Sequence, residues 1–246
     1  MKKINIKYAA DILNLNSSTL RYWEKEGLIN FSRGESNNYR EFSSNDLLEL
    51  LDLQLCRDLE IPLKELKGRK QWNLEKWEEV SDTQLKYVEE KIKKYRILKN
   101  KILRKKFLIE EIERNKDSLI YVEALDIAYK FLLEDDSIFD KTIIIAYREN
   151  PEVHGIFISL DTSKMSYGIF SNSSEEKFIW QNKKAEGFLF GILKVGRDGT
   201  LSNLNELLNL AQLEGCEIDY IVGKYLISAN DGEEFCDYYG AYLKIR

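Results

Sequence analysis

The stretch "LRYWEKEG", residues 20–27, brings one arginine and two aromatic residues together in a short segment. Three polar side chains of a helix that begins near Ser17 share one face, because they lie at i, i+3 and i+4: Ser18, Arg21 and Tyr22. We expect Leu20 and Trp23 to point inward. The shared face can make hydrogen bonds to phosphate oxygens and to base edges, so these residues are candidates for contact with nucleic acid.

The elements that would position this face can be predicted from the flanking sequence. "YAADILNL" has apolar residues at helical spacing, and "NSSTLRYWEKEG" begins with capping hydroxyls and ends at a glycine, which predicts two short helices and a tight turn. The polar stretch "LINFSRGESNNYREFSSND" is typical of a hairpin or wing with Asn37 and Asn38 at its tip. Three wing residues could reach flanking phosphates: Arg33, Tyr39 and Arg40.

Two further helices are predicted after the wing. Ser44 is expected to cap "NDLLELLDLQLCRDL", and Pro62 lies at the first turn of "PLKELKG". In this order, "LRYWEKEGLI", "NNYREF" and "IPLKELK" resemble the N-terminal domain of the MerR family of bacterial transcription regulators. Asn38 and Glu60 depart from glycines that are frequent in that family, and neither departure is expected to prevent the fold.

The MerR resemblance, which covers about residues 4–67, implies roles for the candidate residues. It places a recognition helix with Ser18, Arg21 and Tyr22 in the major groove. It places Arg33, Tyr39 and Arg40 on the DNA backbone. Members of the family bind promoters as dimers and distort the DNA when an effector binds, so RNA polymerase is affected through the DNA.

A long helix is predicted from Leu74 to Arg114, a stretch without proline or glycine. Its apolar residues recur mostly every three or four positions, which is typical of a coiled-coil seam with a slip near Lys99 and a polar Lys105. The resemblance implies an antiparallel coiled coil between two copies of the chain. The alternative is a solvated spacer.

Strand-like runs dominate residues 118–246, with one clear amphipathic helix in "TLSNLNELLNLAQLEG". "DKTIIIAYREN" fits a strand or a helix; as a helix it gives two successive strand-strand-helix-strand-strand units, which would be an internal duplication. Element order and length resemble the GyrI-like effector-binding domain of multidrug-responsive MerR members. Relatives of that fold that stand alone include hydrolases.

This second half holds 18 of the 29 aromatic residues, with 12 basic and 21 acidic residues. Aromatic faces and carboxylates together suit an apolar organic cation, although aromatic residues also fill sheet cores and acids also keep a domain soluble. The candidate ligand-binding residues are Tyr147, Tyr167, Trp180, Phe188, Asp219, Tyr220 and Tyr225. Asp237 is an alternative source of the charge. Gly223 aligns with a buried glutamate of multidrug-binding relatives, which puts the preference for cations in doubt.

Composition excludes several other classes of protein. Cys56, Cys216 and Cys236 are unclustered, and His154 is the only histidine, so we expect no metal site, no cofactor and no Ser-His-Asp triad. No long apolar segment or signal peptide is evident, so the expected compartment is the cytoplasm and no membrane partner is expected. Residues 1–70 hold 12 basic and 11 acidic residues, and residues 71–117 hold 13 basic and 10 acidic residues, so the acidic excess of the chain does not extend to its first half.

The sequence therefore predicts an α+β multidomain protein in three parts: a winged helix-turn-helix domain at 1–73, a dimerisation helix at 74–117 and an α+β effector-binding domain at 118–246. Its expected partners are promoter DNA, a second copy of the chain and a small hydrophobic ligand, with RNA polymerase affected indirectly. No catalytic residue is predicted. The alternatives for the last domain are a protein-docking module and a hydrolase-like enzyme.

Overall fold

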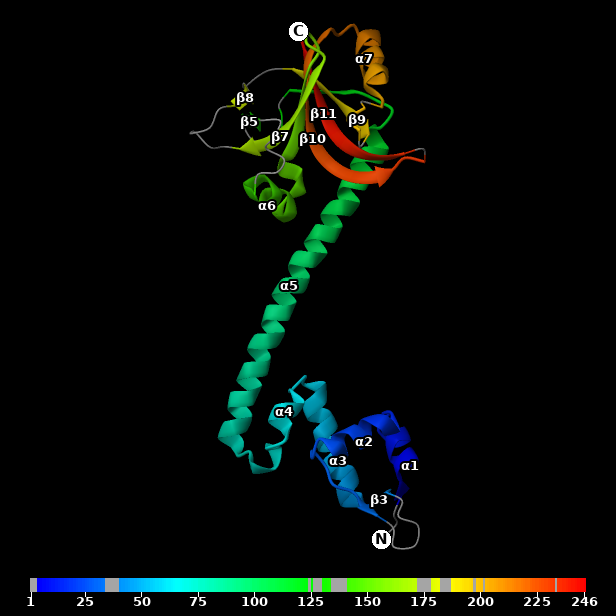
Figure 1. Cartoon of the computed structure of the whole chain (residues 1–246), viewed down its shortest axis with the longest axis vertical. Coiled ribbons are helices and arrows are strands. Elements are labelled where there is room, and N and C mark those ends of the chain that lie inside the picture. The colour runs from blue at the N-terminus through cyan, green and yellow to red at the C-terminus, as the bar shows by residue number, and fades with distance from the viewer. Residues whose placement is uncertain are drawn as a thin grey trace. The chain divides into compact units, whose positions relative to one another are not determined.

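A computed structural model shows two compact units, residues 1–98 and 99–246, and the division falls within one long helix (Figure 1). The structure describes residues 4–33, 40–123, 125, 130–133, 141–171, 178–181, 187–196, 198–200, 202–232 and 234–246. Each unit has its own hydrophobic core, and each is described by itself. No helix in the described ranges is long and apolar enough to cross a membrane.

The N-terminal unit begins with the predicted pair of helices and the wing. The elements are β1 (Ile4–Asn5), α1 (Ile6–Ile12), α2 (Ser17–Lys25), β2 (Ser32–Arg33) and β3 (Arg40–Phe42), and the strands form an antiparallel sheet in the order β1-β3-β2. Asn14 has a φ of 52° in the turn between the two helices, a conformation that asparagine tolerates. Gly27, with a φ of 72°, follows the end of α2 as expected for a C-terminal glycine.

Helix α3 (Ser44–Asp58) begins with a capping box. The cap is Ser43 rather than the predicted Ser44: its hydroxyl accepts the Asp46 N–H at 3.2 Å, and its own N–H donates to the Asp46 carboxylate at 2.7 Å. Both serines have the right chemistry, but only Ser43 has the acidic residue three positions later that closes the box. Pro62 precedes α4 (Leu63–Leu66), and η1 (Arg69–Gln71) follows.

The core of this unit lies between α1, α2, α3 and β3. Its completely covered members include Ala9, Leu20, Leu50 and Leu53. Arg69 is also buried, and its guanidinium donates to the Glu49 carbonyl at 2.9 Å and lies 3.4 Å from the Asp52 carboxylate. This arginine therefore fastens η1 to α3.

Helix α5 (Leu74–Asn115) is 42 residues long and confirms the predicted continuous helix. Asn73 begins it by accepting the Lys76 N–H at 2.8 Å. Six apolar side chains along it are between 39% and 62% exposed: Leu85, Val88, Ile92, Tyr95, Ile102 and Ile109. Toward its C-terminal end the helix instead buries Leu108 and Ile112 against strands of the second unit.

In the part of the chain that the structure describes, the C-terminal unit contains an eight-stranded antiparallel sheet, α6, α7, the short helix η3 and the C-terminal part of α5. The elements are β4 (Ile120–Val122), β5 (Lys130–Leu133), α6 (Lys141–Glu149), η3 (Pro151–Val153), β6 (His154–Ser159), β7 (Lys164–Ser171), β8 (Phe178–Gln181), β9 (Phe188–Gly196), α7 (Leu204–Leu213), β10 (Ile218–Asn230) and β11 (Phe235–Ile245). Residues 141–149 of the ambiguous segment form the helix α6 rather than a strand. Strands β5 and β8 were not expected from the sequence.

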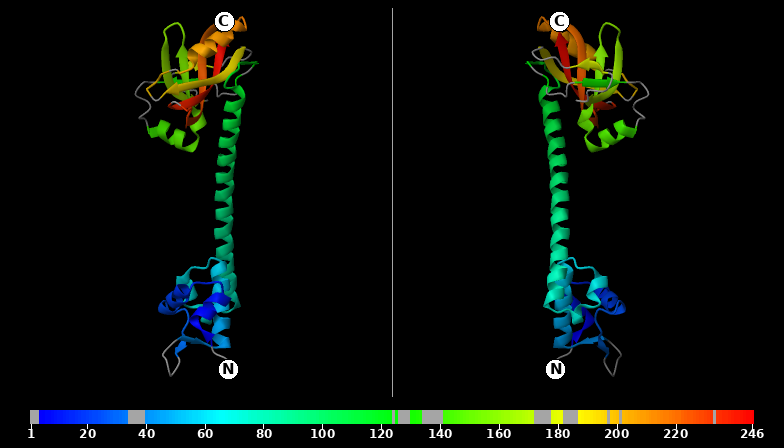
Figure 2. Two further views of the ribbon diagram at one scale, coloured as in Figure 1. Left: turned by 90° about the vertical axis from the view of Figure 1, so that its right-hand side faces the viewer. Right: turned by 90° about the vertical axis from the view of Figure 1, so that its left-hand side faces the viewer.

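The sheet order, β4-β9-β11-β10-β6-β7-β5-β8, has a duplicated pattern. Figure 2 shows the same ribbon from two further sides. Each half of the unit runs strand-strand-helix-strand-strand, as predicted: β4, β5, α6, β6, β7 and then β8, β9, α7, β10, β11. If each strand is replaced by its counterpart in the other half, the same strand order is obtained in reverse. The centre of this symmetry is the β10–β6 pair. The first strand of each half pairs with the second strand of the other half, so neither half completes its own sheet.

The two faces of this sheet carry different cores, since successive residues of a strand point to opposite sides. On one face, Ile221 and Tyr225 of β10 belong to a cluster that includes Leu207 and Ala211 of α7. On the other face, Val222 belongs to an aromatic cluster with Phe188 and Trp180, and Leu226 packs with Leu108 and Ile112 of α5. We call these the tyrosine face and the α5 face.

Candidate functional site

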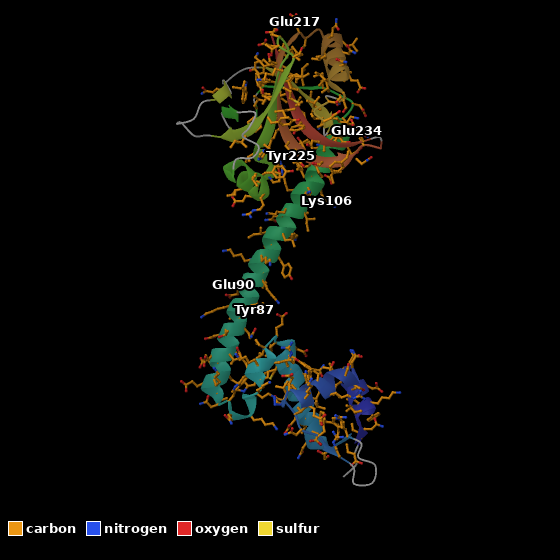
Figure 3. The ribbon with its side chains drawn as sticks, in the orientation of Figure 1. Tyr87, Glu90, Lys106, Glu217, Tyr225 and Glu234 are labelled. Atoms are coloured by element: carbon orange, nitrogen blue, oxygen red, sulfur yellow. The ribbon has the colours of Figure 1, made fainter. Side chains whose placement is uncertain are left out.

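A chain of hydroxyl groups crosses the tyrosine face. The Tyr225 hydroxyl lies 3.4 Å from that of Tyr147 and 2.7 Å from that of Ser228, and Ser228 donates to the Asp237 carboxylate at 2.6 Å. Tyr225 is buried in β10 beside α6, which carries Tyr147 (Figure 3). A carboxylate can only accept, so Ser228 donates to Asp237, Tyr225 donates to Ser228, and Tyr147 donates to Tyr225.

The rings around this chain form an aromatic patch that is open at one side. Tyr239 is 5% exposed and meets Tyr225 edge to face, with ring centroids 5.8 Å apart. Tyr147 and Tyr167 are 43% and 41% exposed. Burial raises the pKa of Tyr225 to about 12 and also raises the pKa of Tyr239. These hydroxyls therefore act as neutral hydrogen-bonding groups near pH 7.

The predicted ligand-binding residues are divided between the two faces. Tyr147, Tyr167 and Tyr225 lie together on the tyrosine face. Trp180, Phe188 and Tyr220 belong to the cluster on the α5 face, where the Trp180 indole donates to the Tyr220 hydroxyl at 3.1 Å. The prediction of one pocket lined by all of these residues is therefore wrong. They form two separate groups, because adjacent residues of β10 point to opposite faces of the sheet.

The two candidate carboxylates are also separated. Asp219 is partly exposed and lies 3.9 Å from the guanidinium of Arg246, whereas Asp237 joins the tyrosines through Ser228. Gly223, where the resemblance implies a buried glutamate in multidrug-binding relatives, is closely covered: a Cβ there would lie 2.6 Å from the Ile156 Cγ1 atom. No group of three His, Cys, Asp or Glu residues that could hold a metal occurs among the residues that the structure describes.

In the N-terminal unit, α2 has the two predicted faces. Leu20 is 0% and Trp23 is 4% exposed, which confirms that both point into the core. Three polar residues are exposed on the opposite side: Ser18, Arg21 and Tyr22. Helix α2 thus presents a continuous polar surface with one guanidinium and one phenol.

The wing is fastened to α2 by an ion pair. Arg33 and Arg40 are cross-strand partners in β2 and β3, and Tyr39 lies outside the described residues. The Arg40 guanidinium donates from Nε to the Glu24 carboxylate at 2.7 Å, and a second nitrogen lies 2.6 Å from the same oxygen. Arg40 therefore holds the wing against α2, and Glu24 is a site residue that sequence reasoning missed.

Residues 4–71 match the family model described as MerR HTH family regulatory protein. The match lies in the N-terminal unit and extends from β1 to η1. A curated relative, the HTH-type transcriptional regulator ZntR homolog of Haemophilus influenzae, is 36% identical over 59 residues, which are 24% of this chain and 44% of that protein. The chain thus spans less than half the length of that curated relative.

Solved structures also resemble the chain, at low identity. HiNmlR, a MerR family regulator lacking the sensor domain and bound to promoter DNA, is 23% identical with a TM-score of 0.36, covering 46% of this chain and 94% of its own. EcmrR, in a DNA complex, is 16% identical with a TM-score of 0.36, covering 99% of this chain and 100% of its own. The similarity to the MerR family therefore rests on the match of residues 4–71 and not on these structures.

Within the matched segment, Glu60 has an unusual backbone conformation. Glu60 has a φ of 58°, a backbone region that favours glycine. Its carboxylate forms an ion pair with the ammonium of Lys91 on α5, with 2.5 Å between the oxygen and the nitrogen. Glu60 is therefore a residue with a strained backbone whose side chain contacts α5.

Proposed function

We propose that the chain is a ligand-responsive transcription regulator that binds promoter DNA through its MerR-type domain and distorts it when an effector binds. The observation that carries the DNA part of the proposal is the exposed face of α2, with Ser18, Arg21 and Tyr22, in a segment that matches the family model. An α-helix with such a face fits the major groove, and the arginine can reach guanine edges or phosphates.

The test selects a binding site from a random duplex library with the full chain and then measures variants on the selected duplex. Arg21→Ala should weaken binding about fivefold to a hundredfold, the loss expected for a base or phosphate contact. Lys86→Ala, which removes an exposed cation from α5, is the matched control and should bind normally. Equal affinities for Arg21→Ala and the parent chain would refute the assigned role of α2.

We also propose that the chain acts as a homodimer. The exposed apolar stripe on α5 supports this, since Val88, Tyr95, Ile102 and Ile109 recur every seven residues and expose large side chains. Covering such a stripe with a second helix removes apolar area from water, and the gain is about 25 cal/mol per Å². A twofold dimer would select a palindromic site from the library.

For the second half of the chain we propose a GyrI-like effector-binding domain whose site is the open patch on the tyrosine face. The duplicated strand-strand-helix-strand-strand order supports the domain type. The exposed rings of Tyr147 and Tyr167 offer stacking area, and the hydroxyl chain ending at Asp237 leaves the Tyr147 oxygen oriented as an acceptor. A small hydrophobic ligand with a hydrogen-bond donor or a positive charge fits these groups.

Calorimetry with tetraphenylphosphonium and with a neutral aromatic amide of similar size tests the effector site. Saturable binding that Tyr147→Ala abolishes supports it. Trp180 fluorescence is a poor reporter because the indole lies on the α5 face. The alternatives are a protein-docking module and a hydrolase; turnover of an ester analogue by the full chain would favour the hydrolase.

A further inference from the structure

A cluster of charged residues joins α5 to the sheet away from the tyrosine patch. Its centre is Glu152 in η3, whose side chain is 15% exposed. The Arg104 guanidinium of α5 donates from Nε to this carboxylate at 2.6 Å and makes a second, shorter contact with it. The Lys224 ammonium of β10 lies 3.4 Å from the same group. One carboxylate thus connects the long helix with a central strand.

The backbone of η3 fixes this carboxylate in place. Pro151 occupies the start of the short helix, and the Asn150 side chain accepts the Glu152 N–H at 3.3 Å. The bond to Arg104 is the main reason that the pKa of Glu152 is lowered, with Lys224 adding to the effect. Glu111 of α5 is the other carboxylate near these cations, and burial raises its pKa. Of the two carboxylates, Glu152 is therefore the one whose charged form its neighbours stabilise.

Two short routes lead from Glu152 to the tyrosine patch. Lys224 and Tyr225 are neighbours in β10, and their side chains point to opposite faces of the sheet. A displacement of Tyr225 therefore moves the backbone that carries Lys224. On the other route, His154 lies two residues after Glu152 and meets the Tyr147 ring edge to face at 5.0 Å. Both exposed and buried tyrosines of the patch are thus connected to this one carboxylate.

We propose that Glu152 is a positioning residue that couples the tyrosine patch to the C-terminal part of α5, through Lys224 on one side and Arg104 on the other. This proposal rests on the proposed function, because it takes the patch to be the effector site. A ligand that shifts Tyr225 or Tyr147 changes the two ion pairs and so changes how firmly α5 is held. An effector can act only by such a difference in interaction between two states of the chain.

The coupling can be measured without any ligand, by hydrogen exchange on the full chain. Tyr225→Phe removes a hydroxyl from the patch, and we expect it to speed amide exchange in residues 104–112 about fivefold, near the lower end of typical coupling energies. In a Glu152→Gln background the same substitution should change exchange in that segment less than twofold. Exchange in α7, on the tyrosine face, is the internal reference for general destabilisation. Glu149→Gln, an exposed carboxylate three residues earlier, is the matched background control.

Equal effects of Tyr225→Phe on residues 104–112 in the parent and Glu152→Gln backgrounds would overturn the proposal. So would an effect that the Glu149→Gln background also removes. If Glu152→Gln does not fold, Lys224→Gln cuts the β10 connection alone and should reduce the fivefold effect in the same way. Failure of tetraphenylphosphonium and of the neutral amide to bind would count against the proposed effector site, and the exchange result would still decide the coupling.

Discussion

Gly223 of β10 is a position in the C-terminal unit where a single added methyl group should have a strong effect on stability. A Cβ added there would lie 2.6 Å from Ile156 Cγ1, 3.1 Å from its Cδ1 and 3.3 Å from Tyr239 Cβ. Carbon atoms in contact normally stay about 3.5–4.0 Å apart. Ile156 is 0% and Tyr239 is 5% exposed, so neither side chain can move into solvent. We expect Gly223→Ala to destabilise the unit by about 1–3 kcal/mol, the usual range for overpacking.

The crowding argument makes a stronger prediction for a double variant. Ile156→Ala alone leaves a cavity and should cost about 2–5 kcal/mol. In the double variant the new methyl group occupies part of that cavity, so the combined loss should be at least about 1 kcal/mol smaller than the sum of the single losses. Urea unfolding followed by far-ultraviolet circular dichroism gives the three free energies. Additive losses would show that Ile156 does not crowd this glycine, and the reasoning would be refuted.

Two further predictions concern backbone strain and pH. Glu60→Gly should leave the protein about 1 kcal/mol more stable than Glu60→Ala in urea unfolding, because both lose the contact with Lys91 but only glycine relieves the positive φ; equal stabilities would contradict the strain. Since burial raises the pKa of Tyr225 to about 12, above about 10 in the unfolded chain, its contribution is complete below pH 10 and is lost as the pH rises toward 12. Tyr225→Phe should therefore flatten the fall in urea midpoint between pH 9 and pH 11, and an unchanged slope would count against it.

Local signals were sufficient to predict most elements of the fold. The helical period alone places Leu20 and Trp23 on the side of α2 opposite its polar face. Both side chains are buried, as this placement requires. The absence of helix breakers after Leu74 predicted α5, and the strand runs around α7 predicted its flanking strands. The sequence predicts the duplicated order only if "DKTIIIAYREN" is a helix. Its β-branched residues favour a strand, whereas its position between strands favours a helix.

The composition of the sites was less predictable, because it depends on contacts between residues far apart in sequence. Nothing local indicates that Arg40 pairs with Glu24, so the arginine looked like a simple phosphate contact. Likewise Glu152 meets Arg104 and Lys224 only because η3 lies beside both α5 and β10. To decide which residues of β10 point to which face of the sheet, the strand register must be known. A shift of the register by one residue would move each side chain to the opposite face.

The same contacts change the argument about charge in the second half of the chain. Its acidic excess suggested a preference for cations, yet several of the described carboxylates already have basic partners: Asp231 pairs with Lys194, Glu152 with Arg104, and Asp219 lies near Arg246. Asp237 is the carboxylate that the structure joins to the tyrosine patch, and it acts there through Ser228 and two phenols. Through this chain of neutral hydroxyls, the Tyr147 oxygen becomes a hydrogen-bond acceptor at the open side of the patch. The negative charge of Asp237 itself stays several hydrogen bonds away. The chain of hydroxyls therefore favours ligands that donate a hydrogen bond and requires a positive charge less strictly than a carboxylate in direct contact would.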